Sequence, residues 1–439
     1  MKYFMVIWVV AMILGSNGFG QQKPNPIATL QFTKERLLAD LDRMPRYTCV
    51  QTVTRTYYDA RAGAHGSSCS ALITARSSRK HALPPFGWDR LRLEVAWVDG
   101  NNVYSWVGAP RFANDNLDKL AGEGPLGSGD FGALLREILL QATLDFEREQ
   151  FIDSKYLLEY SYNMPVEKST YKIKTSDGQQ PIAYGGTLLL DPETQDLVNL
   201  TMRIANLSHN SSTCAANTET SYERISIHNR LILIPRQTQL DILSASGTES
   251  TSEMKFTNCR EYASTIRFLP DGPMSSTRQE STIPAHDEAT TLPAGLPFDA
   301  RIITAVDSDT AAAGDPIEAV LLSPIRSNHK AVIAPAGARI HGRLTNVRWR
   351  SKPAMKYELT VRFESIEING REVAFSAILE PPHSQVLTGT FSGSHLIPLK
   401  PDDDPSIGST FSFSQDHRHV KNLDARWVTI NPRAATERK

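Results

Sequence analysis

Apolar and polar residues alternate along most of this 439-residue chain, and this period of two predicts β-strands. The clearest run is RLRLEVAWV, residues 90–98, whose apolar side chains fall on one side of an extended chain. The dipeptide Asp99-Gly100 follows, and alternation resumes in NNVYSWV, residues 101–107. Because Asp-Gly is typical of tight hairpin turns, residues 90–107 are predicted to form an antiparallel β-hairpin.

Similar runs recur through the rest of the first 268 residues. Two short polar turns, DPET at 191–194 and IHNR at 227–230, each separate two apolar runs and indicate antiparallel neighbours. We predict further strands within residues 48–58, 156–164, 169–175, 184–207, 222–243 and 254–269. Strands joined by short turns in this way indicate a single long sheet.

Two segments have a helical period instead. In FTKERLLADLDRM, residues 32–44, apolar residues recur every three or four positions, and Thr33 is the predicted cap. In DFGALLREILLQATLDF, residues 130–146, Asp130 is the predicted cap and the apolar residues share one face. Residues 21–268 are therefore predicted to form a curved antiparallel sheet, or an open barrel, that carries two helices.

A polar stretch separates this region from a second one. Residues 269–290 are rich in Pro, Ser, Thr and charge without an apolar period, which is typical of a linker. Beyond it, Pro-Ala-Gly occurs at 293–295 and 335–337, each time before an apolar run, and Asn369-Gly370 is a strong hairpin signal. We predict a smaller all-β domain over residues 291–430, so the fold class is α+β and mainly β.

The first twenty residues have the order of a secretory signal. Lys2 precedes an apolar run, 4–14, and Gly18 and Gly20 are small residues suited to a cleavage site before Gln21. After that run, no segment of the sequence is long and apolar enough to predict a membrane-spanning helix. We therefore expect residues 1–20 to be a signal peptide and the mature protein to be exported, to the periplasm or the extracellular space.

The four cysteines, Cys49, Cys69, Cys214 and Cys259, are most simply two disulfides in an exported protein. Three pairings are possible, and sequence alone does not choose between them. We favour Cys49–Cys69 with Cys214–Cys259, because each bond would close a local loop. A metal site is the less favoured alternative, since no CxxC pair is present.

Composition and motifs argue against catalysis and nucleic-acid binding. The formal net charge is −1, so no general field attracts nucleic acid, and phosphate-binding glycine loops are absent from the sequence. We interpret Gly127-Ser128-Gly129 as a loop, His417 and His419 as part of an edge strand, and 402–404 as a solvated acidic turn. We therefore predict a protein that is not an enzyme and holds no cofactor and no metal.

Two family resemblances follow from these motifs. The leading helix, the Asp-Gly hairpin and GGTLLLDPETQDLVNLTMRI resemble the bacterial lipoprotein-carrier group, the LolA/LolB-like fold, over residues 28–268. LPAGLPFDARIITAV and AVIAPAGARIHGRLTNV, within 291–380, resemble the β-domain of TrbI-type conjugation proteins. The first resemblance implies an envelope protein with a lipid-carrying role, and neither implies a catalytic residue.

A curved sheet covered by helices also suggests an apolar cleft. The candidate lining residues are Leu93, Val95, Trp97, Trp106, Leu188 and Leu190. The alternative is that these residues simply pack the core beneath the helices. We therefore expect either binding of an apolar ligand, a lipid or a lipidated protein, or a structural module that docks other envelope proteins. A secreted hydrolase with an unrecognised site is a third hypothesis.

Overall fold

The computed structural model describes sixteen segments or single positions of the chain. These are residues 23–60, 64, 66–98, 101–109, 112, 120, 124–125, 131–175, 178–204, 211–227, 229–262, 292–327, 330–352, 355–380, 408–413 and 419–430. The predicted signal peptide, the predicted linker, Asp99-Gly100, Asp130 and His417 lie outside them. None of the helices in the described segments combines the length and apolar character that crossing a membrane requires.

The helices differ from the predicted ones at their ends. They are α1 (Pro26–Asp42), α2 (Cys69–Ser77), α4 (Phe131–Gln141) and the short 3-10 helix η1 (Val166–Lys168). The start predicted near Thr33 is wrong, because the Asn25 side chain accepts hydrogen bonds from the Ile27 and Ala28 amides and caps the helix earlier. Pro26 fits the first helical position, where no amide donor is needed.

The second helix is shorter than predicted. It ends at Gln141, and strand β4 (Thr143–Ile152) begins where the helical pattern was expected to continue to residue 146. Residues 143–146 pair with β5 (Lys155–Met164), for example Thr143 with Asn163, so pairing with a neighbouring strand overrides the local period. Helix α2, which Ser68 caps, was not predicted at all.

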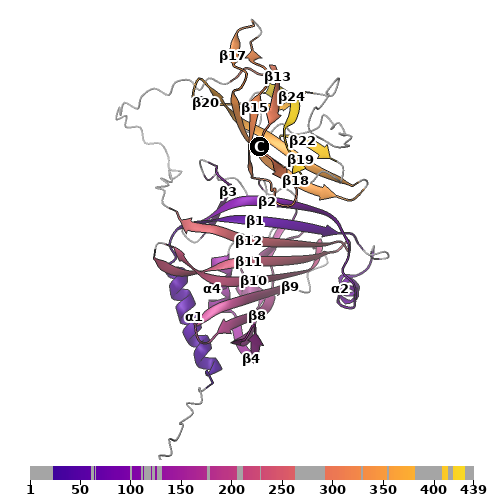
Figure 1. Cartoon of the computed structure of the whole chain (residues 1–439). Helices are drawn as coiled ribbons and strands as arrows, with labels where there is room; N and C mark the ends of the chain where they lie inside the picture. Colours follow the sequence, from indigo (N-terminus) through magenta and orange to yellow (C-terminus); the bar gives the residue numbers. More distant parts are fainter. Residues whose placement is uncertain are drawn as a thin grey trace, which may run out of the picture.

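The first half is one curved antiparallel sheet, as predicted. Its strands lie in the order β3-β2-β1-β12-β11-β10-β9-β8-β5-β4 (Figure 1). The remaining bounds are β1 (Tyr47–Tyr58), β2 (Pro85–Val98), β3 (Asn101–Trp106), β8 (Tyr184–Asp191), β9 (Asp196–Ile204), β10 (Thr213–Ile227), β11 (Arg230–Ser244) and β12 (Glu249–Glu261). β6 (Lys172–Thr175) and β7 (Gly178–Pro181) form a separate hairpin. The DPET and IHNR turns join β8 to β9 and β10 to β11, as predicted.

The regular elements in the described part of the second half are all strands. They are β13 (Pro297–Ile302), β14 (Val306–Asp307), β15 (Pro316–Leu321), β16 (Ile325–Arg326), β17 (Val332–Ala334), β18 (Arg339–Arg350), β19 (Lys356–Ile368), β20 (Arg371–Ala374), β21 (Ser376–Leu379), β22 (Ser409–Phe413), β23 (His419–Val420) and β24 (Leu423–Ile430). Gly295 and Gly337 have φ of 84° and 85°, so both Pro-Ala-Gly turns use glycine as predicted. Asn369-Gly370 joins β19 to β20.

The two halves share hydrogen-bonded backbone along one edge of β2 (Figure 1). The start of that edge, at Trp88, pairs with β18 at Trp349, and its end pairs with β3. Between them the Ala313 amide donates to the Arg90 carbonyl at 2.8 Å, and the Arg92 amide donates to the Ala313 carbonyl at 2.7 Å. One continuous sheet therefore crosses the predicted linker boundary, and independent folding of two domains stays a prediction.

The four cysteines form two disulfides, as predicted, but the favoured pairing is wrong. The bonds join Cys49 to Cys259 and Cys69 to Cys214, across 210 and 145 residues. The physical reason is the strand order. β1 lies beside β12, the last strand of the first half, so Cys49 meets Cys259; α2 packs against β10, so Cys69 meets Cys214. The spacing of the cysteines along the sequence, on which the favoured pairing rested, does not show which elements lie side by side in the fold.

Candidate functional site

An apolar pocket lies where α1 and α4 meet the concave side of the sheet. Leu41 and the following Met44 form its α1 side, and Gly132 and Leu135 form its α4 side. Strand residues complete it: Tyr47, Cys49, Val95, Trp97, Asn102, Tyr222, Leu233, Ile234, Pro235 and Phe256. The enclosed space is about 40 Å³, inside a hollow of about 550 Å³ that includes the open solvent at its mouth.

The alternation of β1 and β2 places the sheet residues of this apolar pocket. Tyr47 pairs with Trp97 and Cys49 pairs with Val95, so their side chains lie together on one face. The Cys49–Cys259 bond joins this wall to β12. The pocket is therefore built on covalently linked strands, whereas its other wall is helical.

Gly132 lets α4 approach this wall closely. A Cβ atom at Gly132 would lie 2.4 Å from the Cη2 atom of Trp97, a separation that packed atoms do not adopt. The absence of a side chain therefore allows the Trp97 ring to lie against the helix backbone.

The structure divides the six predicted lining residues between different places. Val95 and Trp97 line the apolar pocket. Leu188 and Leu190 are buried in the neighbouring cluster beneath α1 and α4, and Leu93 is fully buried. Trp106 packs on a cluster near the junction between the halves. A ligand-binding role for any of the six stays a prediction.

Sequence reasoning missed several residues that the structure brings to the pocket. Leu41 and Met44 were on the predicted apolar face of the first helix, which is a signal that could have found them. Tyr222 and Leu233 lie on β10 and β11, and no local signal places these strands opposite α1. Their position follows from the order of strands in the sheet.

The polar groups of the pocket are few and uncharged. The Tyr222 hydroxyl is buried and has no hydrogen-bond partner among the described residues. Burial raises the pKa of Tyr222 above its ordinary value, and the neighbouring Tyr47 raises it further. The hydroxyl is therefore a neutral hydrogen-bond donor at physiological pH.

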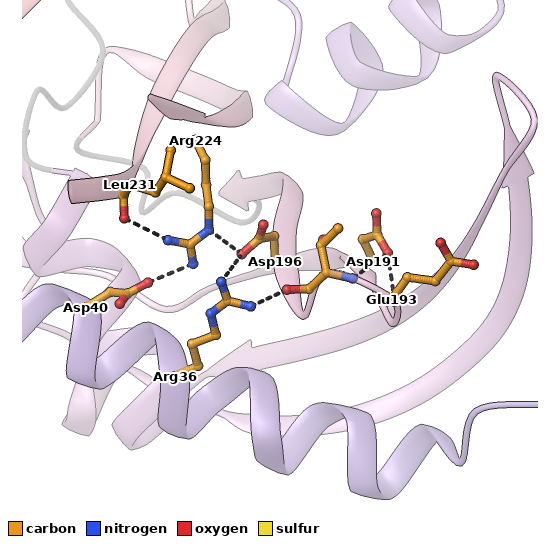
Figure 2. A network of polar contacts seen from close by, with 8 residues as sticks. Arg36, Asp40, Asp191, Glu193, Asp196, Arg224 and Leu231 are labelled. Carbon is orange, nitrogen blue, oxygen red and sulfur yellow. Dashed lines mark hydrogen bonds and ion pairs between the residues drawn. The ribbon is translucent and has the colours of Figure 1, made fainter. Parts of the chain in front are cut away.

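A polar network holds the second half of α1 to the sheet beside the pocket (Figure 2). Arg224 of β10 contacts Asp40 of α1 and Asp196 of β9, each at 2.7 Å. Arg36, one turn before Asp40, donates to the Thr194 carbonyl and lies 3.8 Å from Asp196. Because Asp40 precedes the pocket residue Leu41, this network fixes α1 at the rim of the pocket.

The DPET turn is the anchor for Arg36. The Asp191 carboxylate accepts hydrogen bonds from the Glu193 and Thr194 amides at 2.8 and 3.2 Å, which holds the turn in shape (Figure 2). The turn that was predicted only as a strand connection therefore also positions the Thr194 carbonyl for α1.

A second hollow, of about 750 Å³ including the open solvent at its mouth, opens between β4, β5, β8 and β9. Its lining includes Ser161 and Thr187, and the charged Arg148 and Glu159 pair with each other at 2.6 Å. It is a shallow polar surface without an apolar wall, so the pocket beside α1 is the better candidate for an apolar ligand.

Metal chemistry receives no support from the described residues, in which no group of three or more His, Cys, Asp or Glu side chains is placed to hold an ion. His419 lies on β23, with its Nδ1 atom 3.6 Å from the Asp307 carboxylate. Ser128, His417 and the acidic turn at 402–404 lie outside the described residues.

No protein-family model and no curated protein sequence matches this chain. Two solved structures are similar to it: a DUF1329 family protein from Desulfovibrio piger, at 9% identity, and a domain assigned to outer membrane lipoprotein sorting in Vibrio parahaemolyticus, at 8%. Each match covers 55% of this chain and 95% of the other, with a TM-score of 0.28. At this TM-score neither match transfers a function or a residue role to this chain.

Proposed function

We propose that this chain is an exported, non-enzymatic binding protein whose first half holds an apolar ligand, a lipid or the acyl part of a lipidated partner. The observation that supports this most is the apolar pocket between α1, α4 and the sheet. Its wall combines aliphatic and aromatic side chains with a single unpartnered hydroxyl, a composition typical of small-molecule sites.

Binding of an acyl chain requires the pocket to enlarge. Ligand pockets commonly enclose about 300–1,000 Å³, and the space here is about 40 Å³. α1 is suited to move, because two of its three buried residues, Thr29 and Thr33, are polar. The Thr33 hydroxyl is buried without a hydrogen-bond partner in the described part of the chain, so its burial opposes the packing of α1.

Replacing Arg224 by glutamine is expected to speed ligand entry. The change removes the contacts to Asp40 and Asp196, which lowers the free energy of unfolding by about 1–2 kcal/mol and frees the rim of α1. Stopped-flow fluorescence with a pyrene-labelled fatty acyl ester should show a severalfold faster association.

The matched control is Arg301→Gln, which removes the contact of Arg301 with Asp424 at 2.6 Å in the second half. It should leave the association rate unchanged. An Arg224→Gln protein that takes up the acyl probe no faster than this control contradicts the proposed movement of α1.

Filling the pocket tests the binding site itself. Val95→Phe adds volume to a nearly closed space, so equilibrium titration with the same probe should show binding weakened at least about tenfold, with about 1–3 kcal/mol lost in stability. Val332→Phe, at a residue that is 51% exposed in the second half, should bind as the unmodified protein does. Equal binding by both variants would place the ligand elsewhere.

One observation favours the second candidate function, a module that docks other envelope proteins. The pocket is almost filled in this structure, as expected for a core that serves only to hold the sheet and helices together. A protein that stays folded and binds no acyl probe in the titration would support docking over carrying.

A further inference from the structure

Resting on the proposed function, we infer that the apolar pocket prefers ligands whose apolar chain ends in an uncharged hydrogen-bond acceptor, such as an ester or amide carbonyl. Tyr222 is the residue that makes this selection.

The first observation is the position of Tyr222 in the sheet. Tyr222 lies opposite Pro235 in the β10–β11 ladder, and the register shifts between Ser221 and Tyr222. Proline has no amide donor, and such irregularities re-aim the side chains beside them. Both Tyr222 and Pro235 line the apolar pocket.

The second observation is the unmet hydrogen bond. A buried hydroxyl without a partner is unfavourable, and nearly all buried polar groups in folded proteins find one. Among the described residues the Tyr222 hydroxyl has none. The hydroxyl is closed off in this structure, so a ligand acceptor would reach it once the pocket enlarges and would then supply the missing partner.

The third observation is the absence of a counter-charge. None of the described residues that line the pocket is Lys, Arg, His, Asp or Glu. The nearest cation along β10, Arg224, is already held between Asp40 and Asp196. An ionised carboxylate entering the pocket would therefore lose its hydration without gaining a charged partner, which is strongly unfavourable.

These observations together predict the direction of the preference. Tyr222 donates one hydrogen bond to a carbonyl oxygen, and Tyr47 and Asn102 are further lining residues with polar side-chain groups. An ester or amide satisfies the donor without bringing a charge. A free fatty acid, ionised at neutral pH, would have to bury its charge to reach this donor, so its carboxylate stays in solvent and does not use the Tyr222 hydroxyl.

The test compares a long-chain fatty acid, labelled with pyrene at its far end, with its methyl ester. Both are titrated at about pH 8, where a carboxylic acid is ionised. The unmodified protein should bind the ester at least tenfold more tightly than the acid. Tyr222→Phe should weaken ester binding about tenfold and leave acid binding unchanged.

A matched control removes a similar hydroxyl outside the pocket. The Tyr357 hydroxyl is also buried without a partner among the described residues, and Tyr357 does not line the pocket. Tyr357→Phe should change binding of neither probe. Because both variants delete an unpartnered buried hydroxyl, neither should lower the Tm, which confirms that both fold.

The infrared stretching frequency of a ¹³C-labelled ester carbonyl reports directly on a hydrogen bond to that carbonyl. A purely structural role of Tyr222 would not change this frequency. The stretch should shift to lower frequency on binding to the unmodified protein and not on binding to Tyr222→Phe. Equal affinity for acid and ester, or an unchanged ester affinity in Tyr222→Phe, would overturn the inference and leave the proposed function standing. Failure of both probes to bind would instead contradict the proposed function itself.

Discussion

Replacing Gly314 by alanine is expected to lower the free energy of unfolding by about 3–5 kcal/mol. A Cβ atom at Gly314 would lie 2.1 Å from the carbonyl oxygen of Arg92 in β2 and 2.9 Å from the Trp106 ring. The first neighbour is backbone, so it cannot turn away, and the clash adds to the strain of a φ of 104°. Urea unfolding, followed by circular dichroism, measures the loss.

Gly337→Ala is the matched control for this prediction. Gly337 also has a positive φ, of 85°, but a Cβ atom there would meet nothing within 4 Å. Its replacement should cost only the backbone strain, about 1 kcal/mol. If Gly314→Ala is as stable as Gly337→Ala, Gly314 does not lie in close contact with the Arg92 backbone of β2.

Removing the Cys49–Cys259 bond is expected to destabilise the protein by about 5 kcal/mol. The bond closes a loop of 210 residues, and the chain entropy that a disulfide removes from the unfolded state grows with loop length. The Cys49→Ala, Cys259→Ala double variant should therefore show a clearly lower urea midpoint than the unmodified protein, both kept oxidised.

Removing Cys69–Cys214, which spans 145 residues, should cost nearly as much. The two losses should not add, because the two loops overlap along the chain. Peptide mapping without reduction checks the pairing directly. A crosslinked peptide containing Cys49 and Cys69 would contradict the structure and restore the local pairing that the spacing suggested.

The strands and turns were predictable because their signals are local. Alternation placed β2 and β3, and dipeptides such as Asn369-Gly370 placed the hairpins. The start of α1 was not found, because the prediction followed the apolar period from Phe32 and missed the Asn25-Pro26 cap upstream. The strand β4 was hidden for a similar reason, since its pairing partner decides its conformation.

The non-local features were not predictable from one sequence. Alternation along β2 shows which side chains share a face, so Val95 and Trp97 were correctly placed together. It does not show which part of that face a helix covers, so Leu188, in another part of the sheet, was grouped with them. No local sequence pattern singles out Tyr222, because its unpartnered hydroxyl is a property of the folded protein.

Native mass spectrometry of the protein purified gently from the cells that produce it tests the proposed binding function most directly. We expect a fraction of molecules to carry an added mass in the lipid range, released as a neutral species on collisional activation. That fraction should be much smaller for Val95→Phe and undiminished for Val332→Phe. Recovery of the bare polypeptide alone, even after incubation with membrane lipid extract, would contradict a ligand-holding role for the apolar pocket.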